Sequence, residues 1–162
     1  MRPLYDHCVP SPTTRADGYW AAVFQVDAAE LRRPGLHSTF VEDASAGIYV
    51  LRLADTVRVR APEGRRAVVD ALIEESSLDG ALDGAAWRKA LAGSDALILG
   101  PATHYLASEN VGRSNAAAIA LNAAIRRAGI ARWRCRVDNA ASVALASGFG
   151  LQPYAHNLGI RL

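Results

Sequence analysis

Short runs of alternating hydrophobic and polar residues mark the first half of the chain. The runs LHSTFVE (36–42), GIYVLRL (47–53) and TVRVRAP (56–62) are rich in β-branched residues and are separated by short polar stretches. Such spacing is typical of strands joined by tight turns. The pattern therefore predicts an antiparallel meander, in which the last run has one apolar and one arginine face.

The pattern then changes to helical spacing. Apolar residues recur at intervals of three and four from Glu63 to Glu75, which predicts an amphipathic helix. The run GAAWRKALAG (84–93) predicts a second helix that ends at Gly93. The run DALILG (95–100) predicts a buried strand, and we expect PATHYLASEN (101–110) to be a loop.

The last third of the chain alternates helices and strands. A helix is predicted over 112–128, with Gly129 as its stop, followed by a strand over ARWRCRV (131–137). In that strand one face carries Trp133 and Cys135, and the other carries three arginines. ASVALASG (141–148) predicts a short helix, and QPYAHNLGIRL (152–162) predicts one bent strand or two.

Composition places the chain among globular proteins of ordinary size. It has 162 residues, of which 51% are hydrophobic and 21% are charged. No window approaches the roughly 20 apolar residues that a membrane span needs. The first residues lack the apolar core of a secretory signal, so we expect a cytoplasmic protein that does not bind a membrane.

Charge and cysteine usage exclude two further classes of function. The net charge is +2 and the arginines are scattered, so we expect no nucleic-acid partner. Cys8 and Cys135 have neither the spacing of metal ligands nor that of a disulfide scaffold. We therefore expect two reduced thiols and no metal site.

One stretch carries a family resemblance. A strand ends at Asn139, a short helix follows with Ser142, and GFGLQPYA (148–155) leads into another strand. This order resembles the last third of the GNAT superfamily of acyl-CoA-dependent N-acyltransferases. The tail is similar to the closing strands of an actinobacterial branch, and LGPATHY (99–105) is similar to the end of that branch's extra amino-terminal region.

The resemblance covers 112–162 well and 36–105 more weakly. It implies an α+β fold with a mixed, mostly antiparallel sheet flanked by helices. We expect residues 1–105 to be a degenerate amino-terminal GNAT-like region and 106–162 a carboxy-terminal half, together forming one unit. Only residues 106–110 separate LGPATHY from the next loop and helix, so the first half must supply the missing strands. A bare half-sheet would leave an open edge, and a homodimer could complete it.

The resemblance also implies an acyl-CoA cofactor. In the family, the sheet splays between two parallel strands to hold the pantetheine arm, and the pyrophosphate lies on the amides of the following helix. The corresponding residues here are Asn110, Val111, Gly112, Arg113, Ser114 and Asn115, with Asn139 and Ser142 at the later turn. An ordinary N-cap by Ser114, Asn115 or Asn139 is the alternative, and it is compatible with cofactor binding.

The family's usual general acid is missing. A tyrosine often follows the leucine of the late helix, whereas this chain has Leu145 followed by Ala146. Tyr154 and His156 are the candidate catalytic replacements, with simple packing as the alternative. Neither cysteine has a base at motif spacing, so we expect direct attack without an acyl-enzyme.

Three functions follow from these residues. The first is transfer of an acyl group from acyl-CoA to an amine of a small molecule. The second is another reaction of specialised metabolism on the same fold, catalysed by a cyclase, lyase or isomerase. The third is a binding protein of GNAT fold without catalysis, for which the missing acid counts in favour.

Overall fold

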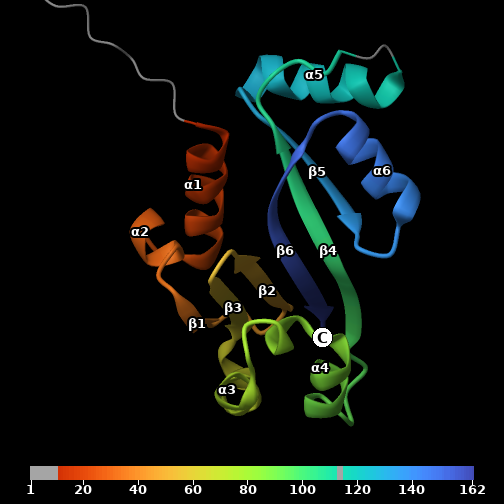
Figure 1. Cartoon of the computed structure of the whole chain (residues 1–162). Helices are drawn as coiled ribbons and strands as arrows, with labels where there is room; N and C mark the ends of the chain where they lie inside the picture. The colour runs from red at the N-terminus through yellow and green to blue at the C-terminus, as the bar shows by residue number, and fades with distance from the viewer. Residues whose placement is uncertain (1–10, 113–114) are drawn as a thin grey trace, which may run out of the picture.

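The computed structural model describes residues 11–112 and 115–162, and within these residues the strands form one mixed sheet. Its six strands have the order β1-β3-β2-β6-β4-β5 (Figure 1). The strands are β1 (Gly35–Val41), β2 (Ile48–Leu53), β3 (Thr56–Pro62), β4 (Leu97–Ala107), β5 (Ala131–Arg136) and β6 (Gln152–Arg161).

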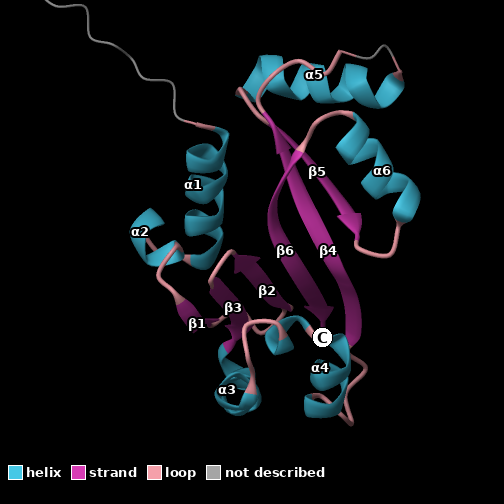
Figure 2. Ribbon diagram, viewed as in Figure 1, coloured by secondary structure: helices cyan, strands magenta, loops and turns pink. Residues whose placement is uncertain are grey.

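Helices flank this sheet, with α5 and α6 near one end and α3 and α4 near the other (Figure 2). The predicted α+β class, with a mixed and mostly antiparallel sheet, is confirmed. The helices are α1 (Pro12–Phe24), α2 (Ala28–Leu31), α3 (Arg66–Glu75), α4 (Gly84–Ala90), α5 (Ala116–Ala128) and α6 (Ala140–Gly148), with 3-10 turns at Glu63–Arg65 and Gly80–Leu82.

Alternation along the strands assigns each core cluster to one face of the sheet. Leu51 and Leu53 on β2 pack against α1, whereas Val50 packs with the residues of α3 and α4. On β5, Cys135 packs in the cluster that α5 and α6 cover. Arg132, on the other face of β5, lies over two aromatic rings of α1. Helix α1 therefore covers one face, and helices α3 to α6 cover the opposite face.

The predicted antiparallel meander is wrong. β1 pairs with β3 in parallel, and β3 lies between β1 and β2. Only β2 and β3 form the expected hairpin, through a turn in which Ala54 has φ 54°. The connection of residues 42–47 between β1 and β2 is long enough to pass the end of β3. Local spacing predicts strands, but it does not fix which strands become neighbours.

The predicted loop at 101–110 is wrong as well, because β4 continues through it to Ala107. A register shift between Leu99 and Ala102 accommodates the Gly-Pro pair inside the strand. Gly100 has φ +122°, and a Cβ there would lie 3.0 Å from the Asn157 carbonyl oxygen. Gly-Pro is typical of a turn in sequence, whereas here it forms a bulge that bends a long strand.

Helix α1 was not predicted. Ser11 caps it by accepting a hydrogen bond from the Thr14 amide, and Pro12 takes the first helical position. Both are recognised start signals, but the helix has a weak apolar periodicity. Its packing therefore comes from a few large side chains: Trp20 and Phe24 are almost fully buried.

The predicted helices α3 and α6 and the strands β5 and β6 lie where the pattern indicates. The helix predicted over 112–128 begins later than expected, because Asn115 is its N-cap and Gly112 lies before it, and α4 ends at Ala90 before the expected Gly93. The boundary expected at 105/106 falls within β4, and β6 pairs with both β2 and β4. Residues on both sides of that boundary thus contribute to one sheet. In the part of the chain that the structure describes, no helix has the length and apolarity to cross a membrane.

Candidate functional site

A surface hollow of about 440 Å³ lies beside the start of β6. It brings together Tyr154 and His156, the two residues that the sequence indicates for catalysis, with Arg52 of β2. Arg52 is directly opposite His156 in the β2–β6 register. Ala54, Pro153 and Ala155 complete the lining. A cation and an imidazole therefore share one site, which Tyr154 also lines.

His156 is held from the side of β4. Its Nδ1 lies 3.0 Å from Oγ1 of Thr103, the residue opposite it in the β4–β6 register. Partial burial, and then the positive charge of Arg52, lower the pKa of His156 below its usual 6.5. The ring is therefore neutral at pH 7 and has a nitrogen that can accept a proton.

Tyr154 has a different environment. Its phenol donates a hydrogen bond of 2.5 Å to Oδ1 of Asp17 on α1. Arg32 pairs with the same carboxylate at 2.7 Å and lies over the Tyr154 ring, 5.4 Å from its centroid. Burial and the Asp17 carboxylate raise the pKa of Tyr154 well above its usual value. The phenol therefore stays protonated and donates its hydrogen bond to Asp17.

The predicted cofactor loop lies between β4 and α5. Asn110 and Gly112 are exposed, whereas Val111 is buried and exchanges both backbone hydrogen bonds with the Asn122 side chain. Asn115 caps α5, because its Oδ1 accepts a hydrogen bond of 2.9 Å from the Ala118 amide. Arg113 and Ser114 lie outside the described residues.

Asn139 and Ser142 form the cap of α6. Asn139 Oδ1 accepts a hydrogen bond of 3.1 Å from the Ser142 amide. Ser142 Oγ in turn accepts one of 3.1 Å from Nε1 of Trp133 on β5. The capping role that the sequence left open is thus present for Asn115 and Asn139, and cofactor binding by these residues stays a prediction.

The cleft that the resemblance implies is not formed beside α5. The strands on either side of this helix, β4 and β5, pair antiparallel from Ala102–Ala107 to Ala131–Arg136. A parallel pair needs a helix that returns the chain along the full strand length, but α5 lies across the strand ends (Figure 1). The backbone groups expected to hold the pantetheine arm hydrogen-bond between these two strands instead.

A second pocket, of about 240 Å³, lies between α1 and the strands β4 and β5, and sequence reasoning missed it. The arginine face of β5 was predicted correctly, since Arg132 and Arg134 are exposed. His104 on β4 packs edge-on against Trp20, with ring centroids 5.4 Å apart. The aromatic pair Tyr19-Trp20 and the alternating arginines of β5 were the sequence features that could have indicated this pocket.

No group of histidine, cysteine or acidic residues that could hold a metal ion occurs among residues 11–112 and 115–162. Comparisons of the chain with protein-family models, with curated proteins and with solved structures found no match.

Proposed function

We propose that this protein transfers an acyl group from acyl-CoA to an amine of a small molecule, at the hollow that Arg52, Tyr154 and His156 line. The observation that carries the proposal is the place of the His156 imidazole in that hollow, opposite Arg52 on β2 and 3.0 Å from the Thr103 hydroxyl. The resemblance of 136–155 to acyl-CoA-dependent N-acyltransferases adds the chemical class. A volume of about 440 Å³ suits a thioester and a small amine together.

The groups of the hollow match the needs of aminolysis. An amine attacks only in its neutral form, and His156 can accept the proton that the ammonium loses. The new C–N bond forms as the C–S bond breaks, and the thiolate leaves with the electron pair. A thiol of pKa about 8.5 leaves without prior protonation, so the tyrosine missing from α6 is dispensable. Arg52 lines the same hollow, although its guanidinium also pairs with the Asp79 carboxylate, and we assign its charge to the developing oxyanion.

The test is release of CoA thiol from acetyl-CoA across a panel of small amines. The wild type should release thiol with at least one amine, and His156→Gln should lower kcat by about 10²-fold or more, the usual contribution of a general base. His37→Gln is the matched control. His37 lies on β1, away from the hollow, and its ring forms a hydrogen bond with the Pro34 carbonyl oxygen. Equal rates in His156→Gln and wild type would remove His156 from the reaction.

Binding without catalysis is the second candidate. The observations that favour it are the continuous β4–β5 ladder and the phenol proton of Tyr154, which is engaged by Asp17. Calorimetric titration with acetyl-CoA and with CoA distinguishes the two. Saturable binding without thiol release from any amine supports the binding protein, and absence of binding overturns both candidates.

A further inference from the structure

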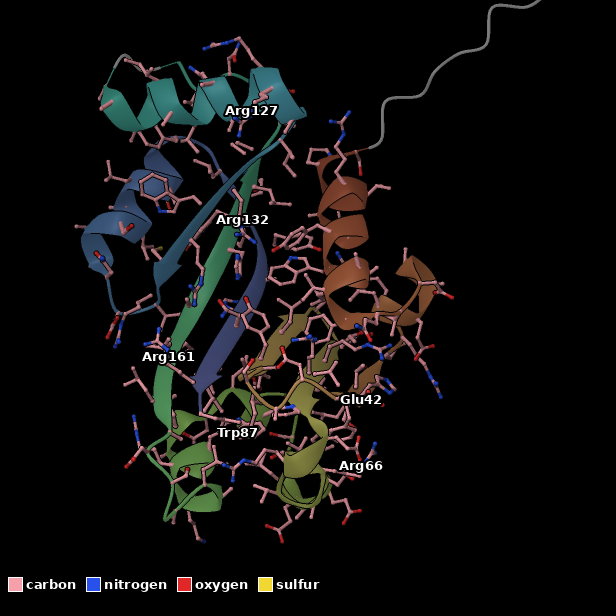
Figure 3. All side chains as sticks on the ribbon, turned by 180° about the vertical axis from the view of Figure 1, so that it is seen from behind. Glu42, Arg66, Trp87, Arg127, Arg132 and Arg161 are labelled. Atoms are coloured by element: carbon pink, nitrogen blue, oxygen red, sulfur yellow. The ribbon has the colours of Figure 1, made fainter. Side chains whose placement is uncertain are left out.

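The pocket between α1 and the strands β4 and β5 has an apolar body with cations at its border. Tyr19 and Trp20 form the wall on α1, and Leu106 and Ile130 face them from the sheet side. Figure 3 shows the labelled Arg132 on the face of the sheet that α1 covers. Ala16, Arg15 and Arg132 complete the lining.

The positive charge at this pocket lies against aromatic rings. The Arg132 guanidinium lies 5.5 Å from the Tyr19 ring centroid and 5.6 Å from that of Trp20. In the ranges 11–112 and 115–162, no carboxylate forms an ion pair with Arg132 or Arg134. Asp17, the acidic residue of α1, is already paired with Arg32.

Two buried polar side chains near the pocket also have atoms without a hydrogen-bond partner among the described residues. His104 is 1% exposed and Asn157 is fully buried, yet His104 Nδ1 and Asn157 Nδ2 have no hydrogen-bond partner within the described chain. Arg134 Nε donates to Asn157 Oδ1 at 3.0 Å. Burial is the main cause that lowers the pKa of His104 to about 4, and the charges of Arg132 and Arg134 add to it. This imidazole therefore stays neutral and adds no further positive charge.

We infer that this pocket binds a small carboxylate with an aromatic or branched apolar body. The carboxylate pairs with Arg132, and the body lies against the rings of Trp20 and Tyr19. A volume of about 240 Å³ is below that of most drug-sized sites, so the ligand is small. The pocket shares no lining residue with the hollow at β6, so this inference is independent of acyl transfer.

Phenylacetate is a suitable probe, with phenylacetamide as its neutral analogue and inorganic phosphate as an anion without an apolar body. Titration of the full chain, followed by calorimetry and tryptophan fluorescence, should show saturable binding of phenylacetate and binding at least about tenfold weaker for the other two. Equal binding of the amide overturns the carboxylate role, and equal binding of phosphate overturns the apolar body. Absence of phenylacetate binding at millimolar concentration overturns the inference altogether.

Arg132→Gln should weaken phenylacetate binding about tenfold or more, and Arg132→Lys should restore part of the affinity. Arg136→Gln is the matched control, because Arg136 lies on the same face of β5 but is paired with Asp138. A thermal melt of each variant separates lost binding from lost folding. Equal losses of phenylacetate affinity in the Arg132 and Arg136 variants would show that only the net charge of the protein matters. That result would overturn the pairing with Arg132.

The histidine behind the pocket gives an independent readout. A bound carboxylate offsets the field of Arg132, so the pKa of His104 should rise from about 4 when phenylacetate saturates the protein. An NMR titration of the imidazole follows this directly. An unchanged His104 pKa with bound phenylacetate would place the ligand elsewhere.

Discussion

Nδ1 of His156 lies 3.0 Å from Oγ1 of Thr103, and the two residues are directly opposite each other on β6 and β4. The threonine hydroxyl oxygen can accept a hydrogen bond from Nδ1–H, which leaves Nε2 as the basic nitrogen. Arg52 occupies the opposite register position on β2. A hydroxyl that orients the ring and a cation that lowers its pKa therefore flank one histidine.

The pH dependence of the proposed acyl transfer should follow His156. Its pKa is lowered below 6.5, so kcat/KM should be level near pH 7 and fall only as the pH drops through that lowered pKa. Arg52→Gln removes a cation, raises the pKa of His156 and should move the falling limb to higher pH. A pH profile of both proteins measures the shift, and an identical limb in the two would exclude His156 as the titrating group.

A tyrosine at position 146, which the GNAT resemblance implies, should not speed CoA release. Ala146 is fully buried in the cluster between α6 and the sheet. Ala146→Tyr would overpack that cluster, and we expect a loss of about 1–3 kcal/mol in the free energy of unfolding. Urea denaturation measures the loss. A stable Ala146→Tyr protein with faster CoA release would contradict this placement of α6.

His104 should make stability depend on pH. Its pKa is about 4 in the folded protein and near 6.5 in the unfolded chain, so unfolding binds a proton between these values. Stability should therefore fall as the pH drops from 6.5 to 4, by about 3 kcal/mol from this group. His104→Gln should lack that part of the pH dependence. Denaturant titrations at several pH values give the change of the free energy of unfolding with pH for both proteins. An equal change in wild type and His104→Gln would contradict the buried neutral ring.

Two ion pairs of different burial should differ in their effect on stability. Arg58 is 2% exposed and pairs with Glu30 at 3.0 Å, whereas Arg136 and Asp138 are both exposed. Glu30→Gln leaves a buried guanidinium without its counter-charge, so we expect a loss of about 2–3 kcal/mol. Asp138→Asn should change the free energy of unfolding by less than about 1 kcal/mol. Chemical denaturation of both variants tests the order.

Two glycine-to-alanine changes should have opposite signs. A Cβ at Gly47 would press against the Ile160 carbonyl oxygen, so Gly47→Ala must displace β2 or β6. We expect a loss of about 1–3 kcal/mol. Gly18 lies inside α1, and an added Cβ there would meet no atom within 4 Å, so Gly18→Ala should gain about 0.5–1 kcal/mol through helix propensity. Thermal melts of the two variants should shift in opposite directions.

Predictability from sequence was uneven in the candidate site. Tyr154 and His156 were identified as titratable residues near a family-like turn, and the structure places both in one hollow. Arg52 was not identified, because it lies about a hundred positions earlier and becomes a neighbour only through the β2–β6 register. Trp20 and His104 meet for the same reason, since α1 packs across a strand from the middle of the chain.

The sequence by itself determined the local elements. Alternation predicted β5 with its arginine face, and helical spacing predicted α3 and α5, because these patterns depend on residues within one element. Caps at Asn115 and Asn139 were also local, since each bonds an amide three residues later.

Only the tertiary structure decided how these elements combine. The parallel pairing of β1 with β3, the passage of β4 through Gly100 and Pro101, and the antiparallel return of β5 depend on hydrogen bonds between distant residues. The charge around His104 has the same origin, because Arg132 and Arg134 reach it from a neighbouring strand. Side-chain periodicity fixes the face that a strand presents, but pairing between strands fixes which groups share that face.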